Sequence, residues 1–410
     1  MVVGAAMVGA AGLAVAHASP ALADPTTSYI AVGSDTTENV MDAFAVAQSG
    51  NELGSYDAVN PVTQAIGEII TPSPGGAGAA VVNNNSNAQN CSFTRPDGSG
   101  QGRLSLIAAL GGAANGLASS PGAGCVDIAR SSSGPTVNAG GALVYIPFAE
   151  DAVSGATSSA TTLPNVDTFT IQNLKDLYAS CGVNPAPNDF VTSGGNNYYP
   201  NGDSPGGAGN FNIDLYLPQA GSGTLAFWQT TLGIVGIPAC DHQTILAGPN
   251  AGQAVEENDG TAVTSDTIGY VPFSIAQWVS QRNHPSLDRR HSAVEHTIGG
   301  VSPCLSGGVA NNCSAANAIL NQSFPIHREV YNIVTACRVD ATAPNPGHGA
   351  SSPCNLDPNL QSMLVGAGSA LCSDSIIIRQ YGFAALNPPT TGNDHCGDDG
   401  AGLRAIAPPV

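Results

Sequence analysis

Basic residues are scarce in this chain. Of its 410 residues, only 11 are Lys or Arg and 30 are Asp or Glu, which gives a formal net charge of −19. Lys175 is the single lysine. Nucleic acids and anionic membranes bind to basic surface patches. The composition therefore excludes nucleic acid and anionic membrane as partners.

Charged residues of both signs are also few. They make up 10% of the chain, and hydrophobic residues make up 42%, whereas about a quarter of an ordinary globular protein is charged. Such a balance excludes a disordered chain and predicts hydrophobic cores. The length allows two domains, and the 50 glycines and 29 prolines indicate that much of the chain is loop.

Long apolar runs are missing after the N-terminal segment, because no later run reaches the roughly 18 apolar residues of a membrane span. Residues 1–23 contain no charged residue and end in Ala21-Leu22-Ala23. This pattern is typical of a secretory signal peptide, and a buried N-terminal helix is the alternative. No cysteine lies near the predicted cleavage site, so we expect a secreted, extracytoplasmic protein with no lipid anchor there.

The motif CxxC is absent, although the chain has 10 cysteines. A zinc knuckle or a redox motif therefore has little support, and an even number of cysteines outside the cytoplasm predicts disulfides. Ten cysteines allow about 945 pairings. Cys304–Cys313 is the most plausible local loop, and chain order suggests Cys91–Cys125 and Cys181–Cys240.

Motifs of the common enzyme classes are missing as well. The chain has no Walker loop and no dinucleotide fingerprint. No Gly-x-Ser-x-Gly elbow occurs at GSGT, because positions 219 and 220 are Gln and Ala. His291 and His296 lie in HSAVEH, where the spacing is neither HExxH nor HxxEH, so we predict a solvated polar segment. The run DHCGDDG (394–400) is predicted to be an exposed turn rather than a cation site. We therefore expect no catalytic residue, no metal and no cofactor.

Strand and helix patterns alternate along the chain. Tyr29–Gly33 predicts a strand, and Glu38–Gln48 predicts a helix with one apolar face. Leu104–Leu117 and Leu225–Ile234 predict two further helices. Strands that alternate with helices indicate an α/β architecture with mostly parallel sheets.

Two apolar segments resemble each other, Leu143–Phe148 (LVYIPF) and Ile268–Phe273 (IGYVPF). Both end in Pro-Phe, and in a two-lobed protein both are candidates for strands that cross between the lobes. Residues 184–209 and 338–360 are rich in loop-forming residues and show no periodicity, so we predict surface loops there.

Four loops rich in Gly, Ser and Thr each precede a helix or a turn, at residues 33–37, 97–102, 130–135 and 221–224. A helix N-terminus offers free N–H groups and a positive dipole end, and Ser or Thr adds a hydroxyl donor. Helix capping explains each loop alone equally well. Four such loops that converge would form an anion site that needs few cationic side chains.

These loops and their flanks resemble the type II periplasmic solute-binding proteins, specifically the phosphate-binding component of ABC transporters. The most specific segments are LPQAGSGTLAFW (217–228) and TIGYVPFSIAQWV (267–279). The similar segments are colinear over residues 29–334, and the tail from about 338 is poorly covered. The other segments are AVGSDTTENVMDAF (31–44), RPDGSGQGR (95–103), IARSSSGP (128–135), LVYIPFAEDAV (143–153), FTIQNLKDLY (169–178) and FPIHREVYNIV (324–334).

The resemblance implies the two-lobed α/β fold of that family, here stabilised by disulfides, with the ligand in a cleft between the lobes. It also implies that loop N–H and hydroxyl groups bind phosphate. The candidate ligand-binding residues are Ser34, Thr36, Thr37, Ser99, Arg130, Ser131, Ser132, Ser222, Gly223 and Thr224.

The sequence departs from the family pattern in two loops. The family usually has an acid in the third loop, where this chain has Ser132, so Asp35 or Asp97 is the candidate acceptor for a protonated phosphate. The family also has an arginine and an acid shortly before GSGT, and segment 218–220 (PQA) has neither. We expect Arg130 to supply the replacement counter-charge; a surface or interlobe salt bridge is its alternative role.

Together these observations predict a monomeric solute-binding protein that captures inorganic phosphate, or a similar tetrahedral oxyanion, by cleft closure. Its partners would be the membrane subunits of an ABC importer. We expect lobe 1 to comprise residues 24–147 and 271–410, and lobe 2 residues 148–270. The alternatives are a secreted phosphatase-like enzyme that uses the same loops, and a secreted surface protein of this fold that has lost phosphate binding.

Overall fold

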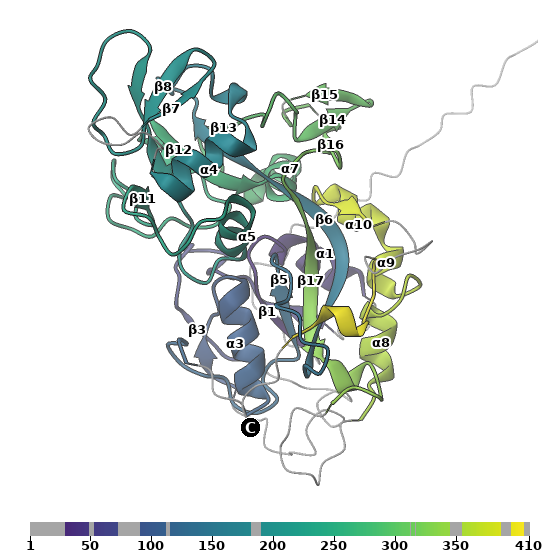
Figure 1. Ribbon diagram of the computed structural model, residues 1–410. Coiled ribbons are helices and arrows are strands. Elements are labelled where there is room, and N and C mark those ends of the chain that lie inside the picture. Colours follow the sequence, from purple (N-terminus) through teal and green to yellow (C-terminus); the bar gives the residue numbers. More distant parts are fainter. Residues whose placement is uncertain are drawn as a thin grey trace, which may run out of the picture.

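The chain forms two lobes that share one sheet (Figure 1). The computed structural model describes residues 29–48, 53–72, 91–111, 115–181, 190–311, 313–315, 317–344, 355–386 and 395–405. The predicted signal peptide lies outside the described residues. Within these ranges, no helix has the length and apolar character that crossing a bilayer requires.

Strand β6 (Leu143–Ser158) joins the two lobes. Its first part pairs antiparallel with β17 (His327–Thr335), and its second part pairs with β12 (Gly269–Ser274) and β13 (Ala293–Glu295). The sheet follows the order β11-β10-β12-β6-β17-β5-β1-β2. The chain therefore crosses between the lobes within β6, after the LVYIPF segment. Strand β17 makes the return, since IGYVPF pairs with the second half of β6.

The parallel strands β2, β1 and β5 form the sheet of the first lobe. Strand β1 is buried along its whole length, as expected of an apolar run in the middle of a sheet. Helix α1 follows the loop at residues 33–37, and α3 begins within the segment 97–102. The elements of this lobe are β1 (Tyr29–Gly33), α1 (Glu38–Ala47), β2 (Leu53–Ser55), β3 (Ile69–Ile70), β4 (Phe93–Thr94), α3 (Ser99–Ala109), β5 (Ile128–Ser131), η3 (Ala336–Arg338), α8 (Pro358–Leu364), α9 (Ala370–Ser373), α10 (Ser375–Gln380), β18 (Ala384–Ala385), η4 (Ala401–Leu403) and β19 (Arg404–Ala405).

Parallel pairing of β10 with β11 and β12 forms the sheet of the second lobe. Helix α5 follows the GSGT loop and buries Trp228 completely. The remaining elements are η1 (Val166–Thr168), α4 (Ile171–Ser180), β7 (Val191–Ser193), β8 (Asn196–Tyr199), β9 (Asn210–Asn212), β10 (Asp214–Tyr216), α5 (Gly223–Leu232), β11 (Asp241–His242), α6 (Thr261–Thr264), α7 (Ile275–Asn283), η2 (Pro285–Leu287), β14 (Cys304–Ser306), β15 (Val309–Asn311) and β16 (Ile319–Leu320).

Each lobe has its own hydrophobic core, and β6 contributes to both. Leu143 to Ala149 lie in the first core, and Ala152 to Ala156 lie in the second. The second core also contains apolar side chains from Ile275 to Ile326, with Ala276 as an exception in the first core. The predicted return to lobe 1 at residue 271 is therefore too early in the chain, because β12 and the segments after it pack against the second half of β6.

The segment 184–209, predicted to be surface loop, contains strands. Residues 182–189 lie outside the described part, but β7, β8 and β9 form a small separate sheet. Tyr198 is fully buried against Phe169, with 4.8 Å between the ring centroids. The aromatic side chains, rather than an apolar periodicity, hold these short strands on the lobe.

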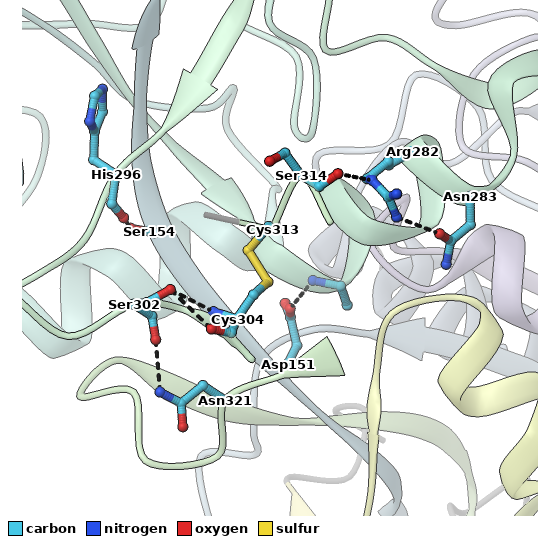
Figure 2. Close-up of a disulfide and its surroundings, with 11 residues drawn as sticks. Asp151, Ser154, Arg282, Asn283, His296, Ser302, Cys304, Cys313, Ser314 and Asn321 are labelled. Atoms are coloured by element: carbon cyan, nitrogen blue, oxygen red, sulfur yellow. Dashed lines mark hydrogen bonds between the residues drawn. A yellow bond between two sulfur atoms is a disulfide. The ribbon is translucent and has the colours of Figure 1, made fainter. Parts of the chain in front are cut away.

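Four disulfides join described cysteines, and three of them are the predicted pairs. Cys91–Cys125, Cys181–Cys240 and Cys304–Cys313 are confirmed, and Cys372–Cys396 adds a fourth pair in the C-terminal segment. Figure 2 shows Cys304–Cys313, where Ser302 and Asn321 hold the β14 end of the bridge through hydrogen bonds. Cys337 is also disulfide-bonded.

Candidate functional site

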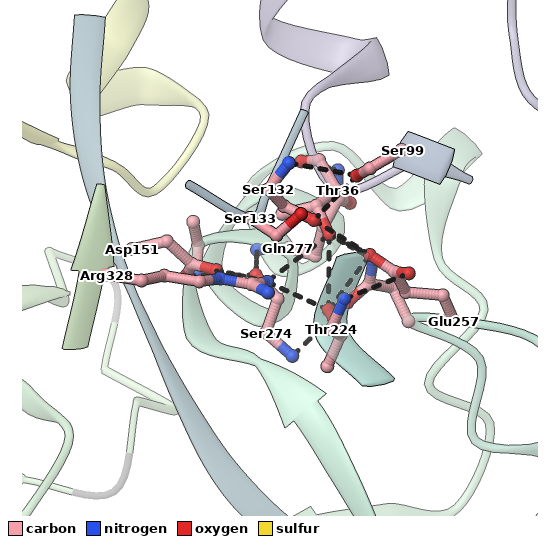
Figure 3. Close-up of polar contacts among 12 residues, drawn as sticks. Thr36, Ser99, Ser132, Ser133, Asp151, Thr224, Glu257, Ser274, Gln277 and Arg328 are labelled. Atoms are coloured by element: carbon pink, nitrogen blue, oxygen red, sulfur yellow. Dashed lines mark hydrogen bonds and ion pairs between the residues drawn. The ribbon is translucent and has the colours of Figure 1, made fainter. Parts of the chain in front are cut away.

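The carboxylate of Glu257 lies between the lobes, surrounded by hydroxyl groups (Figure 3). Its Oε1 accepts hydrogen bonds from Thr36 Oγ1, Thr224 Oγ1 (2.9 Å) and Ser132 Oγ (3.4 Å). Its Oε2 accepts from Ser222 Oγ and from the backbone N–H of Thr224 (3.3 Å). We call this group the interlobe site: Thr36, Ser99, Ser132, Ser222, Thr224 and Glu257.

The first lobe contributes three hydroxyls to the interlobe site. Thr36 and Ser132 follow β1 and β5, which are neighbouring parallel strands, so both loops leave the same edge of the sheet. Ser99 is the first residue of α3, and its Oγ accepts the N–H of Ser132 at 3.0 Å. All three residues are buried. Ser99 therefore positions the Ser132 loop as well as adding a hydroxyl.

The second lobe contributes the N-terminus of α5. Ser222 caps this helix, because its Oγ accepts the N–H of Leu225 at 3.0 Å while it donates to Glu257. Thr224 offers both its N–H and its hydroxyl. A carboxylate at this position meets free N–H groups and the positive end of the helix dipole.

Glycine permits the two lobes to meet at this place. A Cβ on Gly223 would lie 2.2 Å from both Ser99 Oγ and Ser132 Oγ. Gly98 has φ +89°, and a Cβ on it would lie 2.6 Å from the carbonyl oxygen of Gly221. The loops at 98–100 and 221–223 thus pack backbone against backbone, and the cleft is closed around Glu257.

Arg328 is the only basic side chain among the described residues that contacts the interlobe site. It lies on β17 beside Asp151 of β6, and its Nε and Nη2 donate to Asp151 Oδ2 at 3.0 and 2.8 Å. Its Nη2 also donates to Thr224 Oγ1 (2.9 Å) and to Thr36 Oγ1 (3.4 Å). Its Nη1 is buried and has no partner within the described part of the chain. One more donor is thus available beside the site.

The electrostatics of the site favour an ionised Glu257. Burial alone would raise the pKa of Glu257, but the Arg328 guanidinium and the surrounding hydrogen bonds lower it. Burial and then the charge of Glu257 raise the pKa of Asp35 well above its usual range. The two shifts together favour a proton on Asp35 and an ionised Glu257. Burial also raises the pKa of Asp97, to about 6. Glu257, rather than Asp35, is the ionised acid of this site.

Arg130 does not supply the counter-charge that the sequence suggested. It is fully buried, and its guanidinium donates to backbone carbonyl groups of the first lobe and to Ser55 Oγ (2.7 Å). Among the described residues, Arg130 forms no salt bridge either. The carbonyl groups belong to Ala31, Gly33, Ser34 and Tyr56, at 2.6–3.3 Å.

Three other candidate residues lie close in sequence but contribute no contact to Glu257 in the described structure. Ser131 Oγ donates to the carbonyl of Ser133 at 2.8 Å, within its own turn. Ser34 and Thr37 are buried, and their hydroxyls have no partner among the described residues. The candidates that do converge are Thr36, Ser99, Ser132, Ser222, Gly223 and Thr224.

Sequence reasoning missed the charged members of the site. Glu257 lies in EENDG, a run typical of a solvated acidic turn, yet its exposed fraction is 1%. Asp151 lies inside the largely apolar strand β6, where a charged residue is a detectable signal of a buried pair. Arg328 lies between His327 and Glu329 at the start of β17 and gives no such signal. Their pairing depends on the β6–β17 register, which the sequence does not show.

The HSAVEH segment is only partly solvated. His291 is half-exposed and lies 3.5 Å from Asp259 Oδ1. His296 is buried, with its Nε2 2.7 Å from Thr157 Oγ1 and its Nδ1 3.1 Å from Asp167 Oδ1. Across the part of the chain that the structure describes, no three His, Cys, Asp or Glu side chains are arranged to hold a metal ion.

A cavity of about 670 Å³ lies between the lobes next to the interlobe site. Its lining contains the carboxyl groups of Glu38, Glu256 and Asp259, together with Arg289, which forms a 3.2 Å ion pair with Glu38. Burial raises the pKa of Glu38 to about 7 and that of Glu256 to about 8. The void beside Glu257 itself is only about 10 Å³.

Comparison with known proteins gives solved structures alone. No family model and no curated protein matches the chain. One similar structure, from Clostridium perfringens, is described as a phosphate ABC transporter substrate-binding protein with bound phosphate; it is 12% identical, with 88% of this chain and 99% of that chain covered and a TM-score of 0.42.

An ABC-type phosphate transport receptor from Vibrio cholerae is 14% identical, with 87% and 99% of the two chains covered and a TM-score of 0.40. PstS from Borrelia burgdorferi is 12% identical, with 88% and 98% covered and a TM-score of 0.34. These proteins are of the class that the sequence resembles.

Proposed function

We propose that this protein is an extracytoplasmic solute-binding protein that holds inorganic phosphate, or a similar tetrahedral oxyanion, between its lobes. The observation that carries the proposal is the convergence of donors from both lobes on a single anionic group. Thr36 and Ser132 donate from one lobe, and Ser222 and Thr224 donate from the other. A small anion that met both sets would link the lobes.

The chemistry of the donors supports a small oxyanion. Hydroxyl groups and a helix N-terminus bind phosphate without adding charge. Arg328 adds one positive charge next to them, and its Nη1 still has hydrogen-bonding capacity among the described groups. The negative net charge of the chain does not oppose such binding, because these dipoles act at short range inside a closed cleft.

We propose no chemical step at this site. The hydroxyls donate to a carboxylate and an arginine donates to two of them, and no described histidine contacts the set. The disulfides fit an oxidising compartment outside the cytoplasm. In an importer, the closed lobes would together form the surface that the membrane subunits meet.

Calorimetry with phosphate and sulfate tests this function. We expect phosphate to bind, and Thr224→Val to weaken binding about 10- to 100-fold, the effect of losing one hydrogen bond to a charged group. Thr230→Val is the matched control, because Thr230 lies on the same helix, is exposed and donates only to the carbonyl of Ala226 in the described structure. Absence of heat with every oxyanion would contradict the proposal.

A second candidate function follows from Glu257. Because a carboxylate of the chain already accepts the converging hydrogen bonds, the fold is complete without a ligand. A secreted surface protein that keeps this fold and binds no phosphate is therefore the alternative. The same titrations decide between the two.

A further inference from the structure

The carboxylate of Glu257 accepts hydrogen bonds that converge from both lobes. We propose that Glu257 is an internal competitor: its side chain occupies the anion position in the ligand-free protein and must leave before an oxyanion can bind. This inference rests on the proposed function, because it names the residue that controls affinity at the same site.

Space makes the two occupants mutually exclusive. Glu257 is 1% exposed, and the void beside it is about 10 Å³. A void of this size is at the lower limit for a single water molecule, and phosphate is larger. The anion therefore cannot join Glu257 in the closed cleft and has to replace it.

Charge leads to the same conclusion. The positive charge of Arg328 is already opposed by Asp151 at 2.8 Å, and both side chains are buried. A second anion next to an ionised Glu257 would have no cation of its own within the described contacts. A buried and uncompensated charge is strongly unfavourable, so replacement preserves the charge balance and addition does not.

The backbone holds Glu257 in this position. Its neighbour Asn258 has φ +59°, a left-handed conformation that asparagine tolerates better than most residues. Asn258 Oδ1 accepts the N–H of Ser274 (3.2 Å), and its carbonyl accepts from Gln281 Nε2 (2.9 Å). These contacts hold the turn on the second lobe, and Asn258 Nδ2 also donates to Thr36 Oγ1 of the first lobe at 3.2 Å. The proposal therefore assigns the movement to the side chain of Glu257.

Glu257 also links the lobes in the absence of a ligand. It shares the second lobe with Ser222 and Thr224, but Thr36 and Ser132 reach it from the first lobe. Opening the cleft would break the contacts of Glu257 with Thr36 and Ser132 and keep its contacts with Ser222 and Thr224. Glu257 therefore both competes with the anion and closes the cleft around itself.

The Glu257→Ala variant of the full chain tests the proposal. Its affinity for inorganic phosphate and its melting temperature in the presence of formate are compared with those of the wild type. We expect phosphate to bind about tenfold more tightly than to the wild type, the gain when a site that is free in one molecule in ten becomes free in all. We also expect formate, at constant ionic strength, to raise the melting temperature of Glu257→Ala and not of the wild type. Glu256→Gln is the matched control, since Glu256 precedes Glu257 and its described contact is with Gln219.

The outcomes separate this inference from the proposed function. Phosphate that binds the wild type and Glu257→Ala equally, or binds the variant more weakly, overturns the inference and leaves the function standing. Formate stabilisation without any oxyanion binding overturns the function and supports the position assigned to Glu257. If Glu257→Ala does not fold, Glu257→Gln replaces it: tighter phosphate binding supports the competitor, and weaker binding overturns it.

Discussion

Two buried arginines in this protein have opposite roles, and residue type alone does not separate them. Arg130 donates five hydrogen bonds within the first lobe. Arg328 lies where β6 and β17 connect the lobes and contacts hydroxyls from both. The sequence placed Arg130 in a loop of the right composition, and only the direction of its side chain shows that it supports the backbone of that loop.

Arg130→Lys is expected to destabilise the protein and to leave phosphate affinity unchanged. A single ammonium group cannot reach the carbonyl groups that the guanidinium spans, and each buried acceptor left unpaired costs about 1–3 kcal/mol. Chemical denaturation and calorimetry measure the two effects. Arg103→Lys, at a half-buried position on α3, is the control and should change neither. A loss of phosphate affinity at unchanged stability would instead show that Arg130 contributes to phosphate binding.

At the scale of elements, the strand–loop–helix order was predictable, and the pairing of distant strands was not. The strand at 29–33 and helices α1 and α5 lie within a few residues of their predicted ranges. Helix α3 starts at Ser99 and ends at Ala109, because the Gly-Gly at 111–112 follows. The Glu257 turn meets the Thr36 and Ser132 loops only in three dimensions, so no local pattern marks it.

Ser274 caps the N-terminus of helix α7 and also contacts the Arg328–Asp151 pair. Ser274 Oγ accepts the N–H of Gln277 (3.1 Å) and donates to Asp151 Oδ1 (2.9 Å). Ser274→Ala is expected to lower the free energy of unfolding by about 1–3 kcal/mol, since it removes a cap and leaves one carboxylate contact unmade. Denaturant titration measures this. Ser280→Ala on the same helix is the control, because that buried hydroxyl has no described partner and should be lost at no cost.

The whole molecule carries an excess of acid, and part of it is buried. Burial raises the pKa of Asp241 and of Glu295 to about 8. In the unfolded chain both groups ionise near pH 4. Between these values the folded protein binds more protons than the unfolded chain, so the free energy of unfolding falls as the pH rises.

We therefore expect the melting temperature to fall between pH 5 and pH 8. The hydrogen bond with Asp259 is the chief cause that raises the pKa of His291, and this shift adds to the fall in stability with pH. Burial lowers the pKa of His242, and that shift opposes the fall. Thermal unfolding across this range measures the slope. Glu295→Gln should make it shallower, and replacement of the exposed Asp203 by Asn should not. A melting temperature that rises towards pH 8 would contradict the linkage.

The two connections between the lobes are paired strands of a single ladder. From His327 to Thr335, β17 pairs with β6 across the junction of the two cores, with one shift of register between Val330 and Tyr331. A bulge of this kind bends the strand and increases its local twist, so the ladder departs from regular geometry at this step. Both connections therefore run through one paired ribbon, so any relative motion of the lobes would have to bend that ribbon.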